Sequence, residues 1–177
     1  DIEEIQVGFD PRILIEEKID VLAVFKSNEP DTIRKMGHGV NVFEAADYGV
    51  PTLGLTYVGT ENVISGKPDT AERFLRSTLR AVEFIRTNRE ESLDIIMKYA
   101  DKEDRNHMQF MLETELSDAI TAQTLEKGIG WMTMEQWDDF QQNLLKFGAL
   151  GGEVSISDAI HTNFLEEIYT EGKVLWP

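Results

Sequence analysis

The first half of the chain alternates short apolar runs with polar turns. We predict β-strands at residues 5–9, 21–25, 40–43 and 53–58, where the run length and residue types suit a strand. The run at 21–25 is apolar throughout, which predicts burial on both faces. Asp10-Pro11 opens a helix with Asp10 as N-cap, and Pro30 opens a second one. The resulting β-α-β-α-β order predicts an α/β fold with a parallel or mixed sheet.

From Pro68 onward the pattern changes to that of amphipathic helices. Apolar residues recur three and four positions apart, which is the spacing of one helical face. We expect helices over 60–65, 90–99, 104–116 and 117–125, and helices beginning at 68, 133 and 156. The segment Thr133-Met-Glu-Gln136 is a capping box, and Gly148 should end the helix that it starts. The C-terminal half is therefore predicted to be rich in helix.

Composition excludes several classes of function. The chain has 177 residues and a net charge of −16, which argues against binding to nucleic acid or to an anionic membrane. It has no cysteine, so disulfides, thiolate metal sites and cysteine nucleophiles are excluded. The opening Asp-Ile-Glu-Glu is neither an initiator methionine nor a signal peptide. We therefore expect a processed N-terminus or a fragment, whose signal region is not in this chain.

Two polar residues follow the predicted buried strand at its C-terminal end. Asn28 and Glu29 lie there, where ligands bind in parallel α/β sheets. The Glu29 carboxylate could accept hydrogen bonds from an aminopyrimidine or an amide edge. The alternative is a structural one, since Asn28 or Glu29 before Pro30 also suits a helix N-cap.

Three further candidates lie at or after the polar segment Asp47-Tyr-Gly-Val-Pro51. Tyr48 could stack on a planar heterocycle next to Asp47, or it could pack in a hinge. Tyr57 is a weaker candidate, for which core packing is the alternative. The histidines His38, His107 and His161 form no metal motif, and we predict no catalytic residue and no metal site.

Four local patterns, in this order and spacing, resemble the solute-binding proteins of ABC importers, in the branch similar to thiamine pyrimidine synthase. They are Gly8-Phe-Asp-Pro11 with Ile19-Asp20-Val21, Asn28-Glu29-Pro30, Asp47-Tyr-Gly-Val-Pro51 with Pro68-Asp69, and Gly128-Ile-Gly130 through Trp137. The resemblance implies the type II periplasmic-binding-protein fold, in which two α/β lobes clamp a ligand.

The resemblance also implies how the chain is divided. Residues 1–46 would be the closing part of the second lobe, 47–51 the hinge crossover, and 52–177 the returning part of the first lobe with the C-terminal helices. The N-terminal half of such a protein would then be missing from this chain. Bare sheet edges would follow, and a homodimer could form through them.

The function implied by the resemblance is capture and not catalysis. The protein would be an extracytoplasmic component that delivers a small planar heterocycle, such as a thiamine pyrimidine precursor, to an ABC permease without any cofactor. Riboflavin and sulfonates such as taurine are alternative ligands of the same family. A thiamine pyrimidine biosynthetic enzyme is a further alternative, although its cysteine-rich iron motif is absent here. Another alternative function is that of a ligand-sensing domain in a larger receptor.

Overall fold

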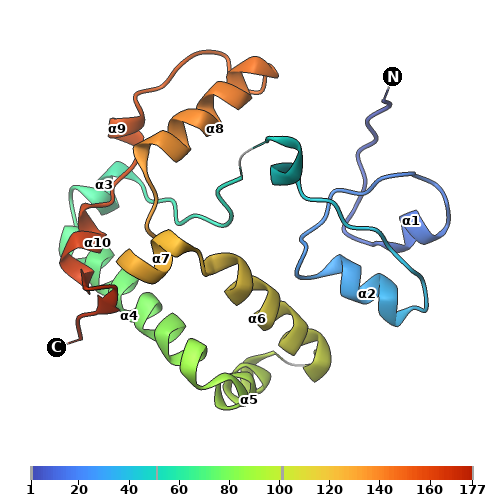
Figure 1. The fold of residues 1–177 in the computed structure, drawn as a ribbon, viewed down its shortest axis with the longest axis horizontal. Helices are drawn as coiled ribbons and strands as arrows, with labels where there is room; N and C mark the ends of the chain where they lie inside the picture. The colour runs from blue at the N-terminus through green and yellow to red at the C-terminus, as the bar shows by residue number, and fades with distance from the viewer. Residues whose placement is uncertain (1, 51, 101, 177) are drawn as a thin grey trace. The chain divides into compact units, whose positions relative to one another are not determined.

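Helices form most of the regular structure in residues 2–50, 52–100 and 102–176, which are the residues that the computed structural model describes (Figure 1). The chain forms two units. Unit 1 comprises Asp1–Val42 and Leu93–Ser117, and unit 2 comprises Phe43–Ser92 and Asp118–Pro177. The division of the chain predicted at 47–51 stays a prediction.

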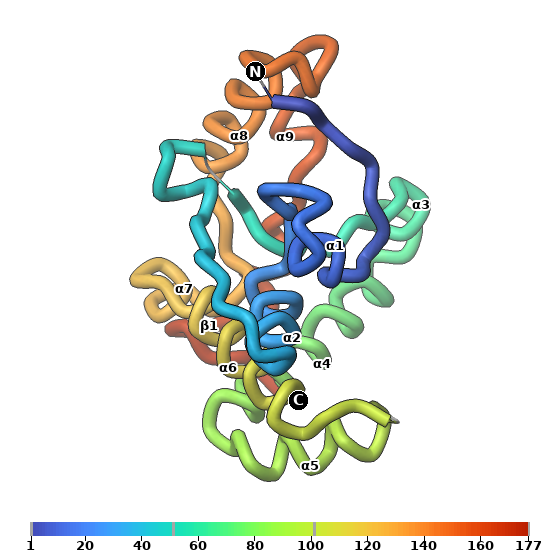
Figure 2. Tube along the Cα trace, turned by 90° about the vertical axis from the view of Figure 1, so that its right-hand side faces the viewer, coloured from blue at the N-terminus to red at the C-terminus, as the bar shows by residue number. Residues whose placement is uncertain are grey.

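The predicted α/β fold is wrong. Within the described residues the one sheet is a two-stranded antiparallel hairpin, and there is no parallel or mixed sheet. The segments predicted as strands at 5–9, 21–25, 40–43 and 53–58 have no hydrogen-bonded neighbour strand, and Figure 2 traces the chain between α2 and η1 as an extended path. A strand forms only where a neighbour takes up its N–H and C=O groups. The apolar residues of these segments suit a strand, but no neighbouring strand is present to pair with them.

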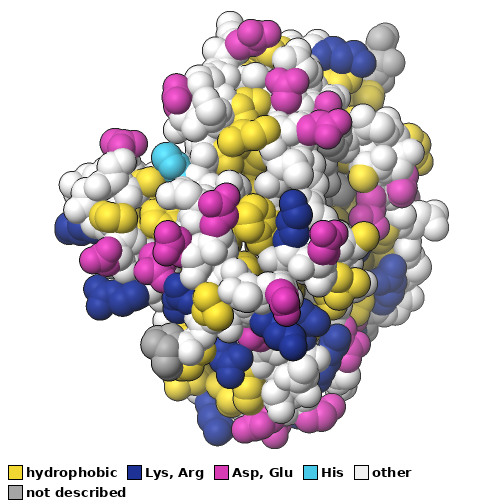
Figure 3. Space-filling view, turned by 60° about the vertical axis from the view of Figure 1, so that its left-hand side comes forward, with side chains coloured by type: hydrophobic (Ala, Val, Ile, Leu, Met, Phe, Trp, Pro, Cys, Tyr) yellow, Lys and Arg dark blue, Asp and Glu magenta, His cyan; other side chains and the backbone are white. Residues whose placement is uncertain are grey.

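Burial at these segments also differs from the prediction. Val21 is 65% exposed, whereas a strand covered on both faces would bury it, and Tyr57 in the last of these segments is 64% exposed. Figure 3 shows hydrophobic side chains lying between charged ones on the surface. The homodimer predicted through the edges of a large sheet stays a prediction without the sheet on which it was based.

The described residues of unit 1 contain α1 (Arg12–Ile15), α2 (Glu29–Lys35), most of α5 (Arg89–Tyr99) and most of α6 (Arg105–Ala119). The predicted N-cap of α1 is shifted by one position. Pro11 occupies the cap, and the Asp10 carboxylate accepts the Arg12 N–H at 3.1 Å. The buried apolar residues are Pro11 at the cap of α1 and, from α2, α5 and α6, Pro30, Ile33, Leu93 and Leu116. The polar residues Ser27 and Glu29 are buried beside Pro30 in the sequence.

Unit 2 is organised around the 20-residue helix α4 (Pro68–Thr87), which begins at Pro68 as predicted. The other helices are η1 (Ala45–Tyr48), α3 (Glu61–Ile64), α7 (Ala122–Lys127), α8 (Met134–Lys146), α9 (Ile156–Ala159) and α10 (Asn163–Ile168). The hydrophobic core joins α4 to the C-terminal segment, and its buried members are Ala71, Leu79, Phe164, Leu165, Ile168, Tyr169 and Val174. The predicted capping box of α8 is confirmed, because Thr133 and Gln136 exchange hydrogen bonds.

The end of the chain differs from the single helix predicted from residue 156. Ile160 has an extended backbone, with φ −119° and ψ 128°, and separates α9 from α10. After α10, β1 (Tyr169–Thr170) pairs with β2 (Lys173–Val174). The two turn residues Glu171 and Gly172 have φ 49° and 71°, the left-handed values of a type I′ hairpin turn. This hairpin brings Tyr169 and Val174 into the core.

Candidate functional site

The turn before α2 is held by the side chain of Glu29. Its Oε2 accepts the backbone N–H of Phe25 at 2.9 Å, and the residue is 8% exposed. Pro30 follows in the first turn of α2, where a missing N–H costs no hydrogen bond. Asn28 occupies the N-cap position, as the structural alternative predicted, but its side chain caps no backbone N–H. Glu29 therefore already accepts a hydrogen bond from the Phe25 backbone, whereas the Asn28 side chain points away from the backbone of α2.

The Asn28 side chain contacts His107, and the two residues belong to a polar cluster in unit 1. Nε2 of His107 lies 2.9 Å from Oδ1 of Asn28, and Nδ1 lies 2.6 Å from Oδ2 of Asp31. The side chains of His107 and Asp31 are 13% and 18% exposed. We call Asn28, Glu29, Asp31, Lys35, Asp104 and His107 the His107 network.

Lys35 and Asp104 complete the His107 network. The Lys35 ammonium lies 3.0 Å from Asp31 and 2.5 Å from Oδ1 of Asp104. The same oxygen of Asp104 accepts the backbone N–H of His107 at 2.9 Å, which is the usual bond of an N-cap to the third helical residue. Asp104 thus caps the N-terminus of α6. The first turn of α6 carries His107, whose ring contacts Asp31 of α2.

These contacts shift the charges of the network. Burial acts to raise the pKa of the Asp31 carboxyl, but hydrogen bonds from His107 and Lys35 outweigh it and leave that pKa below its usual value. The hydrogen bond from Lys35 likewise lowers the pKa of Asp104, and that bond raises the pKa of Lys35. A further hydrogen bond joins the turn before α2 to α6, because Ser27 Oγ donates to Glu115 Oε1 at 2.5 Å.

The other three predicted site residues belong to unit 2, and the structure places them at the surface. Asp47 and Tyr48 lie in η1. Tyr48 is 73% exposed and meets the Phe43 ring edge-on, with 6.0 Å between ring centroids. Tyr57 meets the Phe74 ring in the same way at 5.5 Å. Tyr57 is 64% exposed, so both tyrosines present much of their surface to solvent, as stacking on a planar molecule requires.

Sequence reasoning missed the partners of Asn28 and Glu29. His107 was one of three scattered histidines, and Asp31 and Asp104 were not singled out. The bond between Asp104 and His107 has a local signal, an Asp three positions before its partner, and Asp31 and Lys35 have helical i, i+4 spacing. The contact between His107 and Asp31 spans 76 positions and has no local signal.

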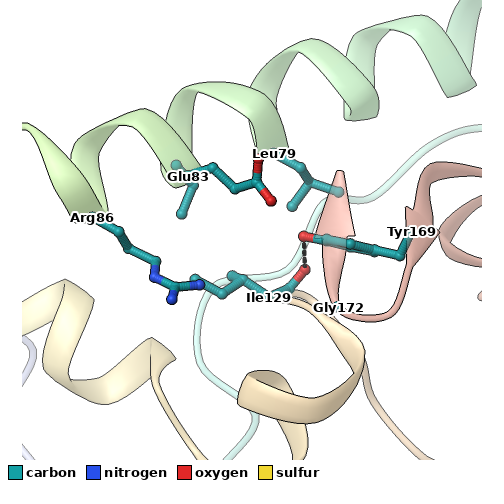
Figure 4. Close-up of a pocket in the computed structure, with 7 residues that line it drawn as sticks. Leu79, Glu83, Arg86, Ile129, Tyr169 and Gly172 are labelled. Atoms are coloured by element: carbon teal, nitrogen blue, oxygen red, sulfur yellow. Dashed lines mark hydrogen bonds between the residues drawn. The ribbon is translucent and has the colours of Figure 1, made fainter. Parts of the chain in front are cut away.

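A second cluster, in unit 2, is a packing site. The Tyr169 hydroxyl donates to the Ile129 carbonyl at 2.8 Å (Figure 4), and the Glu83 carboxylate accepts the Val174 N–H at 2.8 Å. The depression that Tyr169, Ile129 and Glu83 line with Leu79 encloses essentially no free volume. Burial, followed by the nearby Glu83 charge, raises the pKa of Tyr169 to about 12. The cluster is filled by its own side chains and leaves no room for a ligand.

The described residues contain neither a metal-binding cluster nor a membrane-spanning helix. Among residues 2–50, 52–100 and 102–176, no group of three or more His, Asp or Glu side chains is arranged to hold a metal ion. In the same residues no helix is both long enough and apolar enough to cross a membrane.

Comparison with known proteins gives a family and two curated relatives. A family described as NMT1/THI5 like matches residues 1–92. The riboflavin-binding protein RibY of Chloroflexus aurantiacus is 24% identical over 170 residues, which is 93% of this chain and 48% of that protein. The formylaminopyrimidine-binding protein of Halalkalibacterium halodurans is 23% identical over 121 residues, or 67% of this chain and 37% of that protein. The chain therefore spans at most about half the length of these relatives. No solved structure matches it significantly.

Proposed function

Since the chain belongs to the NMT1/THI5-like family, we propose that it is part of a solute-binding protein that captures a small planar heterocycle. The observation that carries this proposal is the similarity to RibY over 93% of the chain, because that relative is a binding protein for a flat heterocycle. The second relative is named for binding a formylaminopyrimidine, which is also flat and rich in hydrogen-bonding groups. Delivery to an ABC permease outside the cytoplasm is part of the same proposal.

The chemistry of the predicted site residues is compatible with such a ligand. Tyr48 and Tyr57 each offer an exposed ring to a planar molecule. Asn28 and Glu29 carry an amide and a carboxylate, the kinds of group that pair with a pyrimidine edge, and a ligand would share them with their partners in the His107 network. A sulfonate would need free cationic groups, and Lys35, the lysine of the His107 network, already pairs with two carboxylates. We therefore rank sulfonates last.

The proposal assigns no catalytic step to this chain. Both curated relatives are named as binding proteins, which supports capture over turnover. The carboxylates of the His107 network are engaged by hydrogen bonds from within unit 1, which suits a structural or binding role. The biosynthetic enzyme stays an alternative that a turnover assay would detect, because a binding protein returns its ligand unchanged.

Thermal unfolding with riboflavin, a formylaminopyrimidine and taurine tests the proposal. A ligand that binds only the folded protein stabilises it by about 2.7 kcal/mol at a concentration one hundred times its dissociation constant. We expect a higher unfolding midpoint with one of the two heterocycles and none with taurine. No shift with either heterocycle would overturn the proposed ligand class, and a shift with taurine alone would replace it with sulfonates.

Matched variants test the proposed contacts. Glu29→Gln keeps an oxygen for the Phe25 N–H but removes the charge, so we expect it to weaken heterocycle binding while the protein stays folded. Glu153→Gln, at an exposed position, is the control. Tyr48→Leu should weaken binding about three- to tenfold if its ring stacks on the ligand. Tyr99→Leu, at a position that is 86% exposed, should leave binding unchanged.

A further inference from the structure

We propose that His107 is a positioning residue for Asn28, and that it acts only while both of its ring nitrogens carry a proton. The inference concerns a histidine that the proposed function does not use. It rests on the proposed function in one respect, because Asn28 matters to binding only if it contacts the ligand. The protonation of the ring is a separate claim that can be tested without any ligand.

Each ring nitrogen of His107 faces an oxygen atom. Nδ1 faces a carboxylate oxygen of Asp31 at 2.6 Å, and a carboxylate oxygen accepts a hydrogen bond. Nε2 faces Oδ1 of Asn28 at 2.9 Å, and an amide oxygen also only accepts. A neutral imidazole has one N–H and can satisfy one of these contacts. Two acceptors therefore require an imidazolium, in which both nitrogens donate.

The orientation of the Asn28 amide decides the argument, because turning it would present its NH₂ group to His107 instead. Nδ2 of Asn28 donates to Oε1 of Glu29 at 3.4 Å in the present orientation. Turning the amide would set its oxygen against that carboxylate oxygen, where two acceptors repel each other. Glu29 cannot swing away without breaking the bond from the Phe25 N–H to its other oxygen. Glu29 thus fixes the orientation of the Asn28 amide. In that orientation the amide oxygen faces Nε2 of His107, which must therefore carry a proton.

The charges around the ring fit a cation. Asp31 and Glu29 face the site from α2, and Asp104 precedes α6 on the ring's own side. Lys35, also in α2, is the positive group of the cluster and pairs with Asp31 and Asp104. The cluster therefore has three carboxylates and one ammonium group. An imidazolium would offset part of the remaining negative charge. At 13% exposure of the His107 side chain, little water is available to replace either bond.

Loss of one ring proton has a defined consequence. Nε2 then no longer donates to Asn28, and two acceptor atoms face each other at 2.9 Å. The Asn28 amide must move or turn, which changes the donor and acceptor that it offers to a bound molecule. His107 would in this way make ligand capture depend on pH through Asn28, while Glu29 keeps its backbone partner.

Nitrogen-15 NMR of the folded protein without ligand tests the proton state directly. The ring nitrogens of His107 are followed across pH together with the side-chain NH₂ resonances of Asn28. We expect the two residues to change together, with both ring nitrogens protonated in the state where the Asn28 resonances have their low-pH positions. The exposed His38 and His161 serve as internal references, because neither contacts Asn28 in the structure. A ring that loses its proton while the Asn28 amide stays unchanged would overturn the proposal.

Two variants connect the proton to binding. His107→Gln carries no charge, and its single amide nitrogen cannot occupy the positions of both ring nitrogens, so we expect affinity for riboflavin or a formylaminopyrimidine to fall about tenfold and to lose its dependence on pH. His161→Gln is the matched control and should keep both the affinity and the pH profile. A pH profile unchanged by His107→Gln would overturn the proposal. If neither compound binds any form of the protein, the proposed function fails, and the NMR titration still decides the role of His107.

Discussion

Nδ1 of His107 lies 2.6 Å from Oδ2 of Asp31, although 76 positions separate the two residues in the sequence. The contact joins the first turns of α6 and α2, and Lys35 extends it to Asp104. Because it connects distant segments of the chain, it stabilises the tertiary structure of unit 1 and not one helix alone. Its strength should therefore be visible in the unfolding of the protein.

The first prediction concerns the Asp31 carboxylate. Burial opposes its ionisation, but the hydrogen bonds from His107 and Lys35 leave its pKa below the ordinary value of 3.8. A lowered carboxyl pKa stabilises the folded state above the ordinary value, and this stabilisation is lost as the pH falls through the folded-state value. We expect Asp31→Asn to lower the free energy of unfolding by about 1–3 kcal/mol at pH 7, and by less at pH 3. Urea unfolding at both pH values measures the difference.

Asp158→Asn is the control for this measurement. Asp158 is exposed in the first turn of the short helix α9. Its replacement should change the free energy of unfolding by no more than about 0.5 kcal/mol at either pH. Equal losses for Asp31→Asn at pH 7 and pH 3 would show that the ionised carboxylate is not the stabilising group.

The sequence predicted features that depend on neighbouring residues and missed those that depend on distant ones. The capping box of Thr133 and Gln136 lies within four residues, so its signal is complete in the sequence. The apolar run at 21–25 carries no information about a partner strand, and it is not a strand in the structure. At the candidate site, the position of Asn28 at the start of α2 was predictable, whereas its contact with His107 was not.

The C-terminal hairpin illustrates an intermediate case. Glu171-Gly172 between Thr170 and Lys173 is a two-residue turn, yet its strands are only two residues long and carry too little alternation to be recognised. Leucine and isoleucine at 165 and 168 extended the helical pattern into this region. The hairpin becomes favourable because it places Tyr169 and Val174 in the core of unit 2.

The second prediction concerns the hydroxyl of Tyr169. Removing it in Tyr169→Phe leaves the Ile129 carbonyl without the donor at 2.8 Å, so we expect a loss of about 1 kcal/mol in the free energy of unfolding. Burial raises the pKa of Tyr169 to about 12, so its stabilising effect is complete below the ordinary value of 10.0 and is lost as the pH rises through about 12. Ultraviolet absorbance should show a late tyrosine ionisation near pH 12, and this late step should vanish in Tyr169→Phe. Tyr99→Phe, at an exposed position, should leave the late step in place.

The third prediction compares one substitution at two depths. Ile168 in α10 is fully buried and Ile2 is 93% exposed. Ile168→Ala removes buried methyl groups and leaves a cavity, so we expect it to cost about 2–5 kcal/mol. Ile2→Ala should cost no more than about 0.5 kcal/mol, since its side chain is already in water. Denaturant unfolding of both variants is the measurement, and similar losses would contradict the assignment of the core.

The last prediction separates backbone strain from steric contact at two glycines of unit 2. Gly148 and Gly172 have almost the same left-handed backbone, with φ of 72° and 71°. A Cβ atom at Gly148 would have no neighbour within 4 Å, whereas one at Gly172 would lie 2.7 Å from the Glu126 carbonyl oxygen. Alanine should therefore cost about 1–2 kcal/mol at residue 148, from the left-handed conformation alone.

At residue 172 the same change carries the same strain and adds a clash with backbone at the end of α7, which cannot move as freely as a side chain. We expect the free energy of unfolding to fall further in Gly172→Ala than in Gly148→Ala, by at least about 1 kcal/mol more. Because the two positions share their φ value, the difference between the variants measures the contact of the hairpin turn with α7. Equal losses in urea unfolding would mean that the turn does not pack against α7 as closely as the structure places it.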